Sequence, residues 1–384
     1  MQRHFFRICA IGLLGAMLAA PPARAQSAPP SAAGVADYWA RLAHYSEIRR
    51  AYDEQASAYW DAVVEKRRAR NAKRRNNEPV GLDDYVLTQP PVYSGPPRPV
   101  DPAAPAGPGP EEKPPIPVVA DFLKMAAEQF GFVPERPQSE LEFKKSYAQV
   151  AASAGLTRDQ IVGVYAFETG GNGTYDMQAG VSPTHARAIS PAVGYNQLLS
   201  TNSVSLLAEH GGRLLGILRQ KSNTLSGDAR LTMEIKIEAL KRMIAFARSV
   251  PDNWNEHDRL AKTTPGGIGA HAVMLDRDTG PLLQVQKLLN SVRFVRSKHY
   301  AAPLSAAELE LMNLTGDGNG IDMVMMPAAL RTRVPTANFF QQSGYERNPV
   351  ARRTGVVAGL IADIEGKIVR ASQSPGARDL AAAF

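Results

Sequence analysis

Residues 157–173 read TRDQIVGVYAFETGGNG, a stretch that predicts a helix followed at once by a turn. Thr157 with Gln160 three residues later matches a capping box, and the apolar residues after them recur at helical spacing. The paired glycines that follow then end the helix. The stretch therefore places one carboxylate, Glu168, at a helix terminus beside a loop.

We expect the Glu168 carboxyl to have a raised pKa. The negative end of the helix dipole disfavours its charged form, and Tyr165 and Phe167 exclude water from its surroundings. A carboxyl that keeps its proton near neutral pH can act as a general acid. Glu168 is therefore the candidate catalytic residue.

A second segment, SPAVGYNQLL at residues 190–199, carries hydrogen-bonding groups on a turn. Gly194 centres the turn, and the side chains of Tyr195, Asn196 and Gln197 follow it into a short apolar stretch. Hydroxyl and amide groups of this kind suit the hydroxyls of a sugar. These residues are the candidates for substrate binding.

The two segments together resemble the E-S-x-F and G-x-x-Q-L motifs of the soluble lytic transglycosylases, a family of the lysozyme-like superfamily that cleaves peptidoglycan. The resemblance implies a lysozyme-like helical catalytic domain without a cofactor. It implies that Glu168 alone serves as acid and then as base at the MurNAc-GlcNAc bond, and that the product closes to a 1,6-anhydro sugar. It also implies that Gly194, Tyr195, Asn196 and Gln197 line the cleft.

Two later segments are similar to further cleft motifs of that family. ELELMNLTG, residues 308–316, resembles the segment A-x-Y-N-x-G, with Met312 where a tyrosine is expected, and the resemblance makes Asn313 a candidate substrate ligand. PTANFF, residues 335–340, is similar to the segment T-x-x-Y-V, with phenylalanine in place of the tyrosine. Tyr345 is then the candidate that supplies a substitute hydroxyl.

Two alternatives stay open. A lysozyme-like glycoside hydrolase needs a second carboxylate that acts as nucleophile or activates water, and Asp176, in the polar loop after Glu168, is the candidate for it. A non-catalytic cell-wall-binding or assembly protein would keep the cleft without turnover, which the two missing tyrosines favour. Anhydro products, reducing-end products or binding alone distinguish the three functions.

The chain begins like that of a secreted protein. Arg3 and Arg7 precede an apolar run and ARA at residues 23–25 is typical of a cleavage site, so residues 1–25 are predicted to be a signal peptide for export to the periplasm. Its removal takes away three arginines and no acid, which lowers the formal charge from +7 to +4. It also removes Cys9, the only cysteine, which excludes a disulfide or a cysteine metal site. Secretion and mild basicity give no support for nucleic-acid binding.

Composition divides the mature chain into four segments. Residues 36–75 predict a long amphipathic helix with a basic end, and residues 76–117 a proline-rich linker with twelve prolines after position 89. Residues 118–372 predict the catalytic domain, which is mainly α, and residues 373–384 a flexible tail. Helices are expected near 117–130, 138–154, 157–168, 200–210, 228–249, 280–297, 304–313, 322–332 and 348–371.

Two features of the long helix suggest partners. Tyrosines recur every seven residues at Tyr38, Tyr45, Tyr52 and Tyr59, a stripe that predicts packing or self-association. The basic end, Lys66–Arg75, is a candidate contact for wall polymer or an anionic membrane surface, and a solvated helix end is the plainer interpretation.

The histidines show no metal-ligand spacing. Asp317 to Asp322, in TGDGNGID at residues 315–322, resemble an oxygen-ligand loop. Aligned with an EF-hand, however, the segment lacks the acids at the first and last ligand positions, which excludes an ordinary EF-hand. A partial calcium turn and a glycine-rich helix cap are the two interpretations left.

Overall fold

The computed structural model describes residues 31–104, 114–182, 184 and 187–384, and its regular structure there is helical. The predicted signal peptide and residues 105–113 of the predicted linker lie outside the described residues. The described residues fall into two compact units, one from those within 1–53 and 93–111 and the other from those within 54–92 and 112–384. The prediction of a mainly α fold is confirmed.

The helix α1, Ala32–Arg75, contributes residues to both units. In the first unit, Tyr45 and Tyr52 each form a T-shaped ring pair with Tyr93, with centroids 6.4 Å and 5.3 Å apart. In the second unit, the Tyr59 hydroxyl donates to the Thr88 carbonyl at 3.1 Å. The proline-rich segment after the helix therefore covers three of the four stripe tyrosines, and self-association through the stripe stays a prediction.

The basic end of α1 is bound within the second unit. Arg67 and Arg70 both donate to the carbonyl of Asn338, and Arg74 forms an ion pair with Asp322 at 2.5 Å. Arg70 is fully buried, and burial lowers its pKa to about 10. These three arginines hold the helix to its own domain, so a wall or membrane contact by Lys66–Arg75 would have to use the others.

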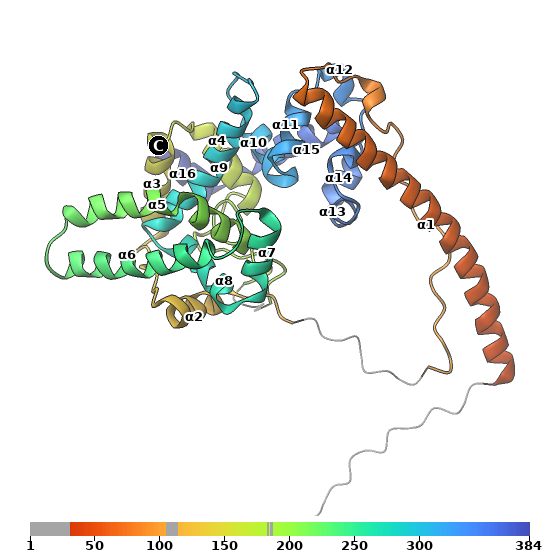
Figure 1. Ribbon diagram of the computed structural model, residues 1–384, viewed down its shortest axis with the longest axis horizontal. Helices are drawn as coiled ribbons and strands as arrows, with labels where there is room; N and C mark the ends of the chain where they lie inside the picture. Colours follow the sequence, from red (N-terminus) through yellow and green to blue (C-terminus); the bar gives the residue numbers. More distant parts are fainter. Residues whose placement is uncertain (1–30, 105–113, 183, 185–186) are drawn as a thin grey trace, which may run out of the picture. The chain divides into compact units, whose positions relative to one another are not determined.

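The second unit contains fifteen further α-helices and three short 3-10 helices among the described residues (Figure 1). The α-helices are α2 Val119–Phe130, α3 Glu140–Ser153, α4 Arg158–Thr169, α5 Ser200–Asn223, α6 Gly227–Ala247, α7 Trp254–Thr263, α8 Pro265–Ala270, α9 Thr279–Ser297, α10 Ala306–Thr315, α11 Asp317–Val324, α12 Ala328–Arg331, α13 Gln342–Arg347, α14 Pro349–Thr354, α15 Val357–Ala371 and α16 Pro375–Ala382. The 3-10 helices are η1 Leu82–Asp84, η2 His271–Leu275 and η3 Thr336–Phe339.

Two hydrophobic clusters form the interior of this unit. One lies around α2, α5, α6 and η2, and the other joins α3, α4, α10 and α15. Nine residues of α4 are buried, including its two glycine-flanking valines, because helices pack on it from several sides. A helix enclosed in this way fixes the direction of the side chain at its end.

Three predicted helices differ from the observed ones. The helix expected at 200–210 continues to Asn223, because Gly211 lies against Ile244 where α5 and α6 pack side by side (Figure 1). The helix expected at 322–332 is split into α11 and α12 at Pro327, which lacks an N–H donor. The helix expected at 348–371 is interrupted at Gly355, whose φ is 69°.

The predicted flexible tail and the predicted linker each contain residues that pack in the interior. Residues 375–382, expected to be part of a flexible tail, form α16, where Leu380 is buried and the Gly376 N–H donates to Asn172. In the predicted linker, Tyr85 is buried beside Phe339, with ring centroids 6.0 Å apart. Composition alone did not reveal these contacts, because each depends on a few apolar residues within a polar or proline-rich stretch.

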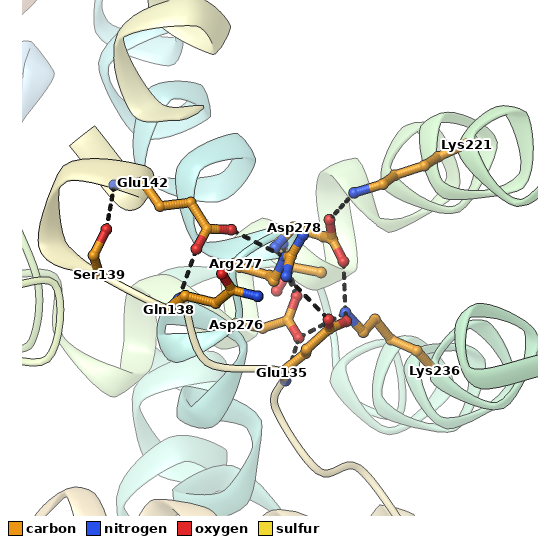
Figure 2. A network of polar contacts seen from close by, with 10 residues as sticks. Glu135, Gln138, Ser139, Glu142, Lys221, Lys236, Asp276, Arg277 and Asp278 are labelled. Carbon is orange, nitrogen blue, oxygen red and sulfur yellow. Dashed lines mark hydrogen bonds and ion pairs between the residues drawn. The ribbon is translucent and has the colours of Figure 1, made fainter. Parts of the chain in front are cut away.

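A network of charges joins the C-terminal turn of α5, the middle of α6 and the N-terminus of α9 (Figure 2). Lys236 is buried and forms ion pairs with Asp276 at 2.9 Å and Asp278 at 2.6 Å, while Lys221 reaches Asp278 from α5. Asp276 also accepts a hydrogen bond from the Glu135 N–H at 2.8 Å. Because every buried charge in this network has a partner, it anchors the helix hairpin to the rest of the domain.

None of the helices in the described part of the chain combines the length and the apolar character that crossing a bilayer requires.

Close packing of α4 on α10 generates a stability prediction for Gly163. A Cβ at this position would lie 2.3 Å from the Cβ of Ala306, so the two helices would have to separate. We expect Gly163→Ala to lower the free energy of unfolding by about 1–3 kcal/mol. This loss outweighs the gain of about 0.5–1 kcal/mol that alanine normally brings to a helix.

Gly212→Ala in α5 is the matched control, since a Cβ there meets nothing within 4 Å. We expect it to stabilise the protein by about 0.5–1 kcal/mol. Urea unfolding followed by circular dichroism measures both changes. Equal stabilisation by the two substitutions would contradict the close approach of α4 and α10.

Candidate active site

Glu168 is held at the end of α4 by local structure at both ends of the helix. The predicted capping box is present, with Thr157 Oγ1 accepting from the Gln160 N–H at 3.2 Å. At the other end, Gly170 is left-handed with φ 66°, so the helix stops directly after Thr169. The prediction of a helix ending beside Glu168 is confirmed.

The loop after α4 is fixed by the following glycine. Gly171 has φ 78°, and a Cβ there would lie 2.1 Å from the Ala371 carbonyl oxygen at the end of α15. Only glycine allows this approach of two backbones. Contact with the end of α15 therefore fixes the backbone of the turn that follows Glu168.

A cavity of about 720 Å³ opens in front of Glu168. Three of the residues singled out from the sequence line it together: Glu168, Gln197 and Asn313. They come from α4, the turn before α5, and α10. Tertiary folding thus brings together motifs that are 145 residues apart at their extremes.

Asn313 contacts the candidate acid directly. Its Nδ2 donates a hydrogen bond to Glu168 Oε1 at 2.7 Å. Burial raises the pKa of the Glu168 carboxyl to about 7, while hydrogen bonds and the positive charge of Lys367 limit the rise. Glu168 therefore lines the cavity with a carboxyl that is close to half-protonated at neutral pH.

Lys367 is the cation beside this carboxyl. It projects from α15, and its Nζ lies 3.8 Å from the centroid of the Phe167 ring. The side chain is exposed, so its charge acts on Glu168 from the solvent side. Such a cation favours the carboxylate form of Glu168 without removing it from its apolar surroundings.

Glu310 is a second acid at this site, and no motif in the sequence marks it as one. It lies on α10 one helical turn before Asn313, is fully buried, and is next to the Glu168 carboxyl. Burial raises its pKa well above the usual value for glutamate, and the neighbouring Glu168 raises it further. Its spacing of three residues from Asn313 was the available signal, since such residues share a helix face.

Hydrogen bonds hold the Gln197 side chain in the cavity wall. Gln197 is one of three non-glycine residues with positive φ in the described part of the chain, with φ 42°. Its Nε2 donates to the carbonyl oxygens of Gly194 at 2.9 Å and Met177 at 3.1 Å. These bonds hold the amide within the turn. The Gln197 Oε1 is then the atom of the side chain that can accept a hydrogen bond from a ligand.

Gly194, Tyr195 and Asn196 build the turn and do not line the cavity, whereas Leu198 of the same motif does. Tyr195 and Asn196 are fully buried, with the Tyr195 hydroxyl donating to Glu140 and Asn196 Oδ1 accepting from Tyr147 at 2.6 Å. Gly194 has φ 85°, and a Cβ there would meet Gln284 at 2.9 Å. The close approach at Gly194 is thus to a neighbouring side chain within the domain.

Asp176 and Tyr345 also lie away from the cavity. Asp176 forms an ion pair with Arg136 and accepts from the Thr174 hydroxyl at 2.8 Å. Tyr345 is buried, and its ring centroid lies 5.7 Å from that of Trp60. The structure therefore does not bring the candidate second acid or the candidate substitute hydroxyl to Glu168.

Other cavity residues were not assigned to the site from the sequence. Trp254 is half-exposed at the N-terminus of α7, while Lys287 from α9 and Asp317 from α11 add one charge of each sign. Trp254 and Lys287 lie in none of the segments singled out from the sequence, and Asp317 belongs to the segment considered for calcium. Each reaches the cavity through helix packing, which a sequence pattern does not encode.

The segment considered for calcium is helical in the structure. Asp317 accepts from the Ser291 hydroxyl at 2.7 Å, whereas Asp322 forms an ion pair with Arg74. The two acids thus have separate partners. Across the described ranges, no group of three or more histidine, cysteine or acidic residues has a geometry that holds a metal ion.

No protein-family model, no curated protein and no solved structure matches this chain.

The raised pKa of Glu168 generates a prediction about stability and pH. Between its ordinary value of 4.5 and about 7, the folded protein keeps a proton that the unfolded chain releases. The contribution of Glu168 to the free energy of unfolding therefore falls as pH rises through this range. Glutamine does not ionise, so Glu168→Gln does not lose stability over this range. We therefore expect its free energy of unfolding to exceed that of the parent by on the order of 2–3 kcal/mol above pH 7.

The same comparison below pH 4.5 should show little difference between variant and parent, since both states then bind the proton. Urea unfolding across a pH series measures the difference. Glu365→Gln, at an exposed position of α15, controls for the general loss of a negative charge. A difference between Glu168→Gln and the parent that does not change with pH would contradict the raised pKa.

Proposed function

We propose that this protein is a lytic transglycosylase-like enzyme that cleaves the MurNAc-GlcNAc bond of peptidoglycan in the periplasm. The observation that carries the proposal is the meeting of Glu168, Gln197 and Asn313 at one cavity, where the acid has a pKa of about 7. Such a carboxyl is suited to give and take a proton at neutral pH. The family resemblance names the same three residues.

The proposed reaction needs only one acid–base group. Glu168 gives its proton to the glycosidic oxygen as the bond from C1 to that oxygen breaks. The 6-hydroxyl of the same sugar then attacks C1, and its proton returns to the Glu168 carboxylate. No water is consumed, so the product has a 1,6-anhydro end and the enzyme regains its initial protonation state.

Neighbouring residues support each charge state of the acid. The Asn313 N–H and the positive charge of Lys367 stabilise the carboxylate that forms when the proton leaves. Burial favours the protonated acid before the reaction and after it. The opposing effects place the pKa where both states are accessible, which is the condition for a residue that acts in both directions.

The cavity itself suits a glycan. Its volume of about 720 Å³ lies within the range of about 300–1,000 Å³ that is usual for ligand sites. Leu198, Leu199 and Leu314 give it an apolar wall, while Gln197 and Asn202 add amides. Trp254 offers a ring at its edge, and aromatic rings stack against the apolar faces of sugars.

A hydrolase is the second candidate, now with a different partner acid. Asp317 lines the same cavity as Glu168, whereas Asp176 is engaged with Arg136 elsewhere. A second carboxylate in the cavity is what activation of water requires. The nature of the products separates this candidate from the transglycosylase.

The first test of the proposal is product analysis. Purified mature protein incubated with peptidoglycan should release anhydro-muropeptides, identified by mass spectrometry, and Glu168→Gln should lower their rate of formation by at least about a thousandfold. Glu365→Gln, which removes an exposed carboxylate, should act like the parent. Reducing-end products that disappear in Asp317→Asn would favour the hydrolase. Absence of products with retained glycan binding would favour a wall-binding protein.

Trp254 generates a separate prediction about substrate binding. In a Glu168→Gln background, which prevents turnover, Trp254→Ala should weaken the binding of peptidoglycan fragments about 2- to 10-fold through loss of ring stacking. Isothermal titration calorimetry measures the change. Trp39→Ala is the matched control, since Trp39 on α1 is 59% exposed and Trp254 51%. Equal affinities for the two variants would remove Trp254 from the glycan site.

A further inference from the structure

Glu310 has no ordinary hydrogen-bond donor although it is fully buried. Among the described residues, no N–H or O–H group is in hydrogen-bonding geometry with either of its carboxyl oxygens. The polar groups next to them are the Glu168 carboxyl and the Asn313 amide. A buried carboxylate left in this state would be strongly destabilised.

Protonation of one of the two carboxyl groups removes this destabilisation. Two carboxyl groups can form a hydrogen bond with each other only when one of them is protonated. Two carboxylates that share a buried site cannot both be charged without a large loss of free energy. The facing pair of Glu168 and Glu310 therefore holds at least one proton near neutral pH.

The surroundings of the two groups decide which one is charged. Glu168 lines the cavity, accepts a hydrogen bond from Asn313 at 2.7 Å and feels the charge of Lys367. Glu310 lies behind it, enclosed by the protein. Charge is less costly at the cavity surface than in the interior, so the carboxylate belongs on Glu168 and the proton on Glu310.

We propose that Glu310 is a carboxylic acid that stays protonated at neutral pH and donates a hydrogen bond to Glu168, as a positioning residue for the acid–base group. It acts as a neutral donor that stabilises the carboxylate formed when Glu168 gives up its proton. This catalytic meaning rests on the proposed function. The order of protonation does not, because it concerns the protein alone.

Other charged groups near the pair are few. Lys367 on α15 is the cation that acts on both acids. Lys287 on α9 and Asp317 on α11 line the cavity in front of Glu168. On α10 itself, Glu308 caps the start of the helix by accepting from the Ser305 N–H at 2.9 Å and lies away from the cavity residues. A substitution of Glu310 should therefore change the pKa of Glu168.

The test measures the pKa of Glu168 in two variants of Glu310. Protein labelled with carbon-13 at the glutamate side-chain carboxyl is titrated by NMR, and the Glu168 signal is identified by its absence in Glu168→Gln. Glu310→Leu removes the donor at nearly unchanged volume. Glu310→Gln keeps an N–H donor but cannot ionise. No substrate is present, so the result is independent of the proposed activity.

The two possible charge states of Glu310 predict opposite shifts. If Glu310 is a protonated donor, Glu310→Leu raises the pKa of Glu168 by about 1–2 units, and Glu310→Gln changes it by less than about 0.5 units. If Glu310 is instead a carboxylate, either substitution removes a repelling charge and the pKa of Glu168 falls. A fall in either variant overturns the proposal, and Glu310→Gln alone decides should the leucine variant fail to fold.

A pH–rate profile then separates this proposal from the proposed function. With active enzyme, the limb of the profile that reports Glu168 should move in Glu310→Leu by the same amount as the NMR titration. An NMR shift as predicted, without any glycan cleavage by the parent, would support the carboxyl pair and refute the transglycosylase. Cleavage by the parent together with a fall in the pKa of Glu168 in the Glu310 variants would support the transglycosylase and refute the protonated Glu310.

Discussion

The packing of α4 against α10 is the constraint on which the rest of the structure depends. Gly163 lets the two helices approach so closely that a single methyl group would collide with Ala306. That approach brings Asn313 within hydrogen-bonding distance of Glu168 and encloses Glu310 beside it. A small residue in the middle of one helix thereby determines the electrostatics at its end, because side-chain positions in a close-packed core follow helix separation.

The candidate site balances two opposing effects on one carboxyl. Burial raises the pKa of Glu168, and the Asn313 N–H and the Lys367 charge lower it. Neither effect alone would leave the group able to change its protonation state near neutral pH. The balance requires a residue at the border between cavity and interior, and the end of a buried helix is such a place.

The N-terminal residues contribute to the same domain more than their composition suggests. Arg70 and Tyr85 lie in the interior beside Asn338, whose side chain also bonds the backbone of Val86 at both N–H and carbonyl. The second half of α1 and the segment that follows are thereby tied to η3 of the second unit. A stretch with many prolines can still be ordered where a few apolar and amide groups find partners.

The sequence by itself determined the helical class and the local structure around Glu168. The capping box and the glycine that ends the helix each involve only a few neighbouring residues, so they can be identified from the sequence alone. Only the tertiary structure decided which of the predicted residues share a cavity. Tyr195 and Asn196 turn inward, and Glu310 joins the acid, because neighbouring helices select the buried face of a turn or helix. Contacts between distant segments set burial and charge, and no local pattern carries that information.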